Sequence, residues 1–346
     1  MNTNTRLGLI AGFLLVISIW TYSDSVSRGD RFARGQKLLP NLNPDEVATI
    51  LILDGEDTVT LRRAEDGFTV AENHDYPARN DAVNRFLRDL LDISLDKDVG
   101  TGDALEEELG LDPPSDSTTE ITLSNATDQE MVHIRLGNSI EDGSGRYVQL
   151  VDGEEDRIYL TSNSAYLSTR ADSFLKKDIV NVSQMLVRSV EGLDFLLDTD
   201  EEDSPVKLTA VPDGKKEKVF EINKLKGILS NLSFDKALLA DDEEVLELEF
   251  SRPLEIILAD DTSYRLSLAT DGENNYMRVA GTHTVGRMAI TLETPEDELK
   301  EKADRLIRAD EIEDFNAFHA SWVYKISTFT ADKLKLRKAD LLEDAD

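Results

Sequence analysis

The sequence predicts an α+β fold built from two repeated modules, each a mainly antiparallel sheet with one or two packed helices. Short runs of alternating apolar and polar residues recur along the chain between turn residues, which is typical of strands. The same order of elements, a hairpin region, a helix, a strand and then a meander, occurs twice. Many strands interrupted by few helices favour α+β over a parallel doubly wound sheet.

The N-terminal segment, residues 1–22, predicts a membrane anchor. An uncharged, mostly apolar run extends from Leu7 to Tyr22, slightly shorter than the roughly 20 residues of a spanning helix. Its end lacks the small residues of a cleavage site, so we expect an uncleaved signal-anchor rather than a removed signal peptide. A linker over residues 23–45 would come next. The anchoring side chains would be Leu7, Ile10, Phe13, Leu14, Leu15, Ile17 and Trp20.

Charge alone leaves the membrane orientation open. The apolar run is followed by Arg28, Arg31, Arg34 and Lys37 but preceded by Arg6 alone. The positive-inside rule therefore favours a cytoplasmic location for the main body of the chain. A signal-anchor with a very short N-terminal tail usually exports the chain on its C-terminal side, which favours the opposite location.

The first module, residues 46–182, begins with three predicted strands within Val47–Ala71, joined at Asp54-Gly55 and Asp66-Gly67. An amphipathic helix follows Tyr76-Pro77, because apolar residues from Val83 to Leu91 recur at helical spacing. It leads into a strand near Ile93–Val99. Four further strands are predicted at Glu120–Ser124, Met131–Gly137, Arg146–Asp152 and Arg157–Ser162.

The second module, residues 183–346, repeats this order. Its helix should carry Ile222, Leu225, Ile228, Leu229 and Leu232, and the exit LSNLSFDKAL matches LLDISLDKDV of the first module. The next strands are predicted at Pro253–Asp260, Ser263–Thr270, Asn275–Gly281 and Gly286–Leu292. Two helices, Gly102–Leu111 and Asp297–Phe315, are expected to be insertions that break the symmetry.

The stretch FHASWVYKISTFTADKL near the C-terminus gathers aromatic residues. Trp322, Tyr324 and Ile326 alternate with Val323 and Lys325, which predicts a half-buried strand closing the second core. We expect its counterpart at Phe174–Val180, His319 at the strand edge, and Thr330 as the cap of a final helix. The alternative is an exposed partner surface formed by Phe318, Trp322 and Tyr324.

Composition excludes several classes of function. The chain has 70 acidic and 38 basic residues and a net charge of −32, so a nucleic-acid partner is not expected. It has no cysteine, which excludes disulfides and thiolate sites. The acidic run Asp198–Asp203 lacks the glycine and the final glutamate of a calcium loop. The four histidines are far apart and the usual catalytic motifs are missing. We therefore expect no enzyme, metal or cofactor.

Several segments resemble the bacterial family catalogued as domain of unknown function 4340. They are Arg34–Ile52, the Tyr76-Pro77 pair, Ser173–Val182 and Phe318–Ile326. The resemblance extends over essentially the whole chain after the anchor and depends on the order and spacing of these segments. It implies a single-pass protein of the inner membrane with its soluble part in the periplasm.

The resemblance also implies a function and partners. It indicates a non-catalytic accessory or scaffold subunit of a gliding-motility-like ABC transport complex, acting with the permease and its extracytoplasmic auxiliary subunit. The alternative is a periplasmic binding module for a glycan, lipid or peptide, because Trp and Tyr can form stacking platforms. An exposed Trp322 would favour that module, and a buried one would argue against it.

Overall fold

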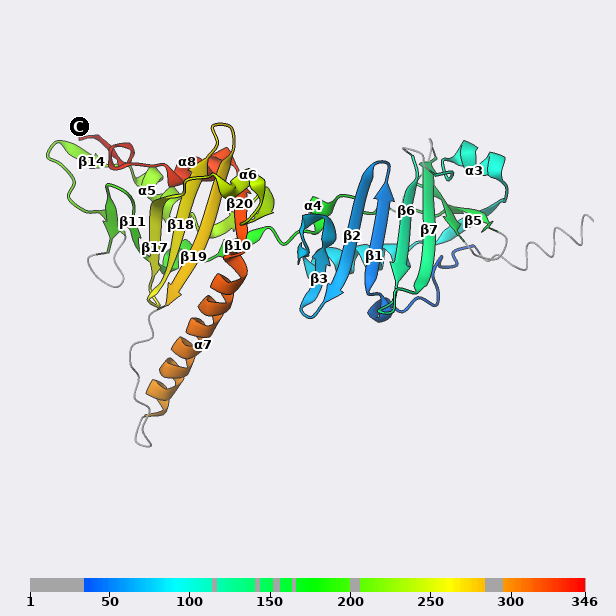
Figure 1. Ribbon diagram of the computed structural model, residues 1–346, viewed down its shortest axis with the longest axis horizontal. Coiled ribbons are helices and arrows are strands. Elements are labelled where there is room, and N and C mark those ends of the chain that lie inside the picture. The colour runs from blue at the N-terminus through cyan, green and yellow to red at the C-terminus, as the bar shows by residue number, and fades with distance from the viewer. Residues whose placement is uncertain are drawn as a thin grey trace, which may run out of the picture. The chain divides into compact units, whose positions relative to one another are not determined.

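The computed structural model describes residues 34–113, 117–140, 144–151, 156–163, 166–199, 206–283 and 295–345. The chain divides into two compact units, with unit 1 ending at Lys176 and unit 2 beginning at Lys177, and each is built on its own sheet (Figure 1). The expected anchor residues, Leu7 to Trp20, lie outside the described part. Within that part, no helix combines the length and apolar character needed to cross a bilayer.

Unit 1 contains one nine-stranded antiparallel sheet in the order β4-β3-β2-β1-β6-β7-β8-β9-β5. The predicted hairpins, helix and meander are confirmed. Its elements are β1 Thr49–Asp54, β2 Asp57–Ala64, β3 Gly67–Val70, β4 Tyr76–Pro77, α2 Asn80–Leu91, β5 Leu95–Gly100, α3 Asp103–Leu109, β6 Thr119–Ser124, β7 Glu130–Ser139, β8 Arg146–Leu150, β9 Ile158–Thr161 and α4 Ala171–Phe174.

Unit 2 contains one eight-stranded antiparallel sheet, β13-β12-β11-β17-β18-β19-β20-β16, and the small pairs β10–β15 and β14–β21. Its elements are β10 Asp178–Asn181, β11 Val187–Glu191, β12 Leu196–Asp198, β13 Lys207–Leu208, β14 Lys215–Glu217, α5 Val219–Lys226, β15 Ser230–Ser233, β16 Lys236–Leu239, α6 Glu243–Leu246, β17 Ser251–Leu258, β18 Thr262–Thr270, β19 Asn275–His283, α7 Glu296–His319, β20 Trp322–Ile326, α8 Thr328–Leu334 and β21 Leu342–Asp344.

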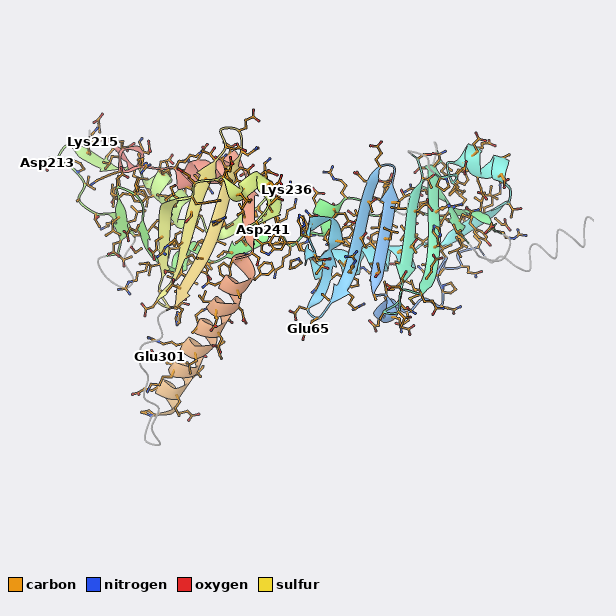
Figure 2. All side chains as sticks on the ribbon, in the orientation of Figure 1. Glu65, Asp213, Lys215, Lys236, Asp241 and Glu301 are labelled. Atoms are coloured by element: carbon orange, nitrogen blue, oxygen red, sulfur yellow. The ribbon has the colours of Figure 1, made fainter. Side chains whose placement is uncertain are left out.

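One face of each sheet forms a core. In unit 1 the inward residues of the central strands, such as Ile52 and Ile121, are fully buried, and they alternate with partly exposed residues as a half-buried strand requires. The buried stripe of α2, which includes Val83, Phe86 and Leu90, completes this core. Charged side chains such as Glu65 in unit 1 and Glu301 on α7 extend outward (Figure 2).

The two large sheets share one strand order. Counted from β5 in unit 1 and from β16 in unit 2, eight successive strands correspond, and unit 1 adds β4 at the far edge. The closing strand β20 therefore corresponds to β9. The segment Gly286–Leu292, which was expected to be a strand of the second meander, lies outside the described residues.

Each unit begins with a short segment that pairs with the chain just after the main helix of that unit. Lys37 bridges to Ser94 after α2, and Asp178 pairs with Ser233 after α5. The prediction that Phe174–Val180 mirrors the closing strand is therefore wrong. Phe174 and Leu175 finish unit 1, where the Arg79 amide donates to the Phe174 carbonyl and Ala78 bridges to Leu175. β10 then opens unit 2, so the unit boundary precedes the Val182–Ser183 boundary expected from the sequence.

The two expected insertions differ in kind. α3 lies between β5 and β6, and α6 occupies the corresponding place between β16 and β17. The Gly102–Leu111 helix is thus a repeated element rather than an insertion. α7 lies between β19 and β20, whereas β8 and β9 are joined in unit 1 by residues 151–157, so α7 is a true addition to unit 2.

The helix of unit 2 is shorter than expected. α5 ends at Lys226, Ile228 and Leu229 come after it, and Leu232 belongs to β15. Gly227 follows the last helical residue, consistent with its poor helix propensity. The apolar residues beyond it, Ile228, Leu229 and Leu232, are buried without being helical.

Candidate functional site

The closing strand β20 is buried on both faces. Trp322 is 7% exposed, and Tyr324 and Ile326 on the same face are buried, as predicted. Val323 on the other face is also fully buried, because it packs with Leu238 and with Val245 of α6. The half-buried strand expected from the sequence is therefore a central one. Of the three aromatic residues proposed for a partner surface, Phe318 alone is partly exposed, and Trp322 and Tyr324 belong to the core.

His319 is the last residue of α7 rather than a strand-edge residue. It is buried, and its Nδ1 lies 2.5 Å from the Tyr324 hydroxyl. The Tyr324 ring also contacts Phe234, with ring centroids 5.1 Å apart. After β20, Ser327 caps α8 by accepting a hydrogen bond from the Thr330 amide, so Thr330 is not the cap.

The C-terminal half of α7 is fixed to β19 by an unusual contact. The Asn316 side-chain Oδ1 accepts a hydrogen bond from the Gly281 amide, and its Nδ2 donates to the Gly281 carbonyl, both at 2.8 Å. β20 pairs with β19 only as far as Met277, so the Asn316 amide takes the place of a strand beyond that point. A Cβ atom at Gly281 would lie 3.2 Å from side-chain atoms of Ile312, a tight contact that Ile312 would have to shift to relieve.

A cavity of about 260 Å³ lies where β19 and β20 separate. Trp322 and His319 contribute to one wall, and Arg265, Ser267 and Arg278 contribute polar groups. The Arg278 guanidinium stacks on the Phe250 ring, with Cζ 4.4 Å from the ring centroid. Two guanidinium groups beside an apolar wall offer donors that fit a small anionic group, which is notable in a chain of net charge −32.

The outer face of each sheet carries the same charged pair. In unit 1, Glu120 of β6 lies opposite Arg135 of β7, with Oε2 and Nε 3.4 Å apart. In the corresponding strands of unit 2, Glu255 lies opposite Arg265, with Oε1 and Nη2 3.6 Å apart. Sequence reasoning did not identify this pair, although EITLS and HIRLG of unit 1 match EIILA and SYRLS of unit 2.

The two charged pairs differ in their surroundings. In unit 1, His133 Nε2 lies 2.9 Å from Glu120 Oε2, and α3 covers the group. Glu106 of α3 accepts a hydrogen bond from the buried Gln149 at 2.7 Å, beside Arg135. In unit 2, the Ser263 hydroxyl donates to Glu255 at 3.4 Å instead, and Arg265 is about half exposed beside the cavity.

A second polar group lies at the β18–β19 hairpin. The buried Tyr276 hydroxyl lies 3.0 Å from both Glu244 and Asp271. Burial, aided by these two carboxylates, raises the pKa of Tyr276 above its ordinary value. The Asn274 backbone amide, its side chain and the Glu273 amide donate to Asp271 and lower its pKa. Tyr276 therefore stays protonated and ties α6 to the hairpin.

Three of the four histidines, one in unit 1 and two in unit 2, have polar partners within the fold. His133 faces a carboxylate and an arginine rather than a nucleophile, and His319 faces a buried tyrosine. His283 of β19 lies 3.1 Å from the Thr262 hydroxyl. Among the residues that the structure describes, no group of three or more histidine, aspartate or glutamate side chains could hold a metal ion.

Comparison with known proteins gives one family. The model of a domain of unknown function, DUF4340, matches residues 68–253, more than half of the 346-residue chain. This match spans α2, the meander of unit 1 and the opening of unit 2. No curated protein and no solved structure gave a match. The chain therefore belongs to the DUF4340 family.

Proposed function

We propose that this chain is a non-catalytic, membrane-anchored accessory or scaffold subunit of an ABC-type, gliding-motility-like transport complex. The observation that carries the proposal is the duplication of the sheet. Two units of the same strand order carry a Glu–Arg pair on corresponding strands, covered by α3 in unit 1 and partly exposed at Arg265 in unit 2. A duplicated fold suits a protein that holds partners, because repeated modules can provide more than one contact site.

The resemblance noted in the sequence supplies the class of partner. It suggests the ABC permease and its extracytoplasmic auxiliary subunit, with the chain anchored by one N-terminal helix and both units in the periplasm. Polar groups such as Glu120 and Tyr276 are engaged in ion pairs and hydrogen bonds within the fold. This arrangement supports a structural role over a catalytic one.

Purification of the full chain from native membranes in a mild detergent tests this proposal. We expect the permease and the auxiliary subunit to co-purify. A chain in which Arg135→Glu and Arg265→Glu reverse both repeated charges should lose them, and Arg188→Glu, which changes an exposed arginine elsewhere in unit 2, should retain them. Recovery of the unaltered chain as a lone monomer would overturn the proposal.

A ligand-binding module is the second candidate, and the cavity beside Trp322 favours it. The buried Trp322 argues against an open aromatic platform for a glycan. The arginines at the cavity instead suit a carboxylate, such as that of an acidic peptide. Titration with a short peptide ending in a free carboxylate should shift the Trp322 fluorescence, and Arg278→Gln should weaken the response. An identical response from a peptide amide would contradict this candidate.

A further inference from the structure

A surface on α5 and α8 differs from the rest of this acidic chain. Val219, Phe220 and Phe329 project from it with 63%, 70% and 66% of their surface exposed. α5 and α8 pack against each other within unit 2, so these apolar residues belong to neighbouring helices. Large apolar side chains exposed together on neighbouring elements are typical of an interaction site. We call this region the Lys–Phe surface. It consists of Val219, Phe220 and Phe329 with the lysines Lys218, Lys224, Lys226 and Lys333.

Lysine is concentrated in the two segments that form this surface. Residues 214–226 and 328–338 contain eight of the chain's 17 lysines but one of its 21 arginines. The same segments contain three acidic residues, Glu217, Glu221 and Asp332, which gives them a net positive charge within a chain of −32. These two segments are therefore basic, and their basic residues are almost all lysine; Glu343 and Asp344 of β21 offset the charges of Lys216 and Lys215.

The lysines and phenylalanines are arranged in the same way on both helices. Lys224 Nζ lies 4.4 Å from the centre of the Phe220 ring, and Lys333 Nζ lies 4.3 Å from that of Phe329. Burial lowers the pKa of Lys333, and the charge of Lys224 nearby lowers it further. The two Lys–Phe pairs thus lie close enough for their charges to interact.

Part of the positive charge is left without a carboxylate partner. Lys224 pairs with Glu221 at 3.0 Å, and Lys215 pairs with Asp344 at 2.6 Å. Among the described residues, no carboxylate pairs with Lys218, Lys226 or Lys333. In a chain with nearly two acids for each base, three unpaired lysines around exposed aromatic rings favour an anionic partner.

The composition distinguishes between kinds of anionic partner. Protein interfaces are depleted in lysine and enriched in arginine, which grips carboxylates with two parallel hydrogen bonds. Surfaces that lie on membranes combine lysine with phenylalanine and aliphatic residues, because the rings enter the acyl boundary while the ammonium groups remain among the headgroups. Two exposed phenylalanines, each stacked under a lysine, with further lysines and a single arginine in the same segments, match the second pattern.

We propose that the Lys–Phe surface of unit 2 docks on the surface of an anionic phospholipid bilayer. Phe220 and Phe329 insert at the acyl boundary, and Lys218, Lys226 and Lys333 contact lipid phosphates. The net negative charge of the chain does not prevent this contact, because repulsion from distant acids is screened beyond about 10 Å. The proposal is independent of the transporter assignment, since it requires lipid and no other protein.

The lack of cysteine makes a direct test feasible. A single cysteine at Val219→Cys in the full chain carries an environment-sensitive fluorophore, and Ile307→Cys on α7, also exposed, is the matched control site. The labelled chains are reconstituted in vesicles of phosphatidylcholine alone or mixed equally with phosphatidylglycerol. We expect a blue shift, and quenching by lipids with spin-labelled acyl chains, at position 219 in the mixed vesicles and not at position 307.

Substitutions then separate the contribution of the lysines from that of the phenylalanines. Lys226→Gln with Lys333→Gln should reduce the ratio of docked to undocked protein by roughly fivefold for each lysine. Phe220→Ser with Phe329→Ser should abolish acyl-chain quenching, and Leu246→Ser at an exposed residue of α6 and Lys300→Gln on α7 should have no effect. Folding of each variant is checked by Trp322 fluorescence.

Three results would overturn the proposal. The first is a label at position 219 that stays in water in both kinds of vesicle. The second is equal quenching in both, which would show that anionic headgroups are not recognised. The third is burial of the label only after an acidic protein is added to the vesicles, which would assign the surface to a protein partner.

Discussion

The two units show how one sheet design produces two different interiors. Tyr159 on β9 pairs with Asp98 on β5, and Tyr324 on β20 pairs with Ala237 on β16. These tyrosines occupy corresponding positions, yet Tyr159 is partly exposed and Tyr324 is fully buried. The difference comes from α7, whose last residue His319 contacts the Tyr324 hydroxyl. The added helix thus contributes to the burial of Tyr324, whereas Ile158 of β9 is fully buried without such a helix.

The charged pairs on the outer faces differ in the opposite way, because here the arginine of unit 1 is more buried than that of unit 2. The Glu120–Arg135 pair is partly buried beneath α3 and bonded to His133, whereas Arg265 of the Glu255–Arg265 pair lines a cavity. α6, which corresponds to α3, packs instead through Val245 beside Tyr276 and Val323. The position of one short helix thus affects the exposure of the arginine in each pair, which is 21% for the Arg135 side chain and 47% for that of Arg265.

The largest expected effect tests the role of α7 in burying the closing strand. Tyr324→Ala should destabilise unit 2 by about 3–5 kcal/mol, because it leaves a cavity beside Phe234 and His319. Tyr159→Ala in unit 1 should cost about half as much, since its side chain is partly exposed. Urea unfolding followed by circular dichroism measures both. Equal losses of unfolding free energy in the two variants would contradict the proposed difference between the two tyrosines.

A smaller effect is expected at the side chain that joins α7 to β19. Asn316→Ala should cost about 1–3 kcal/mol, because it leaves the amide and carbonyl of Gly281 without their partner. Hydrogen exchange at the Gly281 amide should accelerate in this variant. Glu313→Ala, at an exposed position one turn earlier, is the control. Unchanged exchange at Gly281 would show that the contact does not protect this edge.

The repeated charged pair gives a comparison across the two units. Glu120→Gln should lower the unfolding free energy by about 1 kcal/mol more than Glu255→Gln, because the two carboxylates are equally buried but Glu120 lies closer to His133 and Arg135 than Glu255 lies to Ser263 and Arg265. Thermal unfolding of both variants measures the difference. A larger loss in the Glu255 variant would mean that α3 does not strengthen the pair.

The smallest effect is a pH dependence. Hydrogen bonds from Asn274 and Glu273 keep the pKa of Asp271 below its ordinary value of 3.8. The stability that they provide is present above that pH and is lost as the pH falls through the folded-state pKa. The loss of unfolding free energy that Asp271→Asn causes should therefore become smaller below about pH 4. In unit 1, the uncharged Asn125 side chain accepts similar hydrogen bonds from backbone amides. The loss of unfolding free energy that Asn125→Ala causes should therefore not change with pH.

Local patterns predicted the elements better than their pairing. The first helix was predictable because Val83, Phe86 and Leu90 form one apolar stripe, and the hairpins were predictable because glycines mark their turns. The second helix was predicted too long because Ile228, Leu229 and Leu232 stay apolar after the helix ends. Those residues are buried by tertiary packing, which periodicity alone does not distinguish from helix.

The limits of each repeat and the candidate site required the structure. The similarity of Phe174–Val180 to a closing strand concealed a change of unit within it, because Leu175 and Asp178 bond to different sheets. The Glu–Arg pairs depend on cross-strand register, which places residues 15 apart in the sequence in unit 1 side by side. Phe220 and Phe329 come together only because α5 packs on α8.

The Asn316 contact also bears on how the protein behaves at high concentration. An unpaired strand edge is a template for pairing with another chain, and natural proteins block such edges in several ways. Beyond Met277, β19 would be such an edge. One amide side chain, held on a helix, occupies the hydrogen-bonding groups of Gly281. The helix that buries the core of unit 2 thereby also protects it against aggregation through this edge.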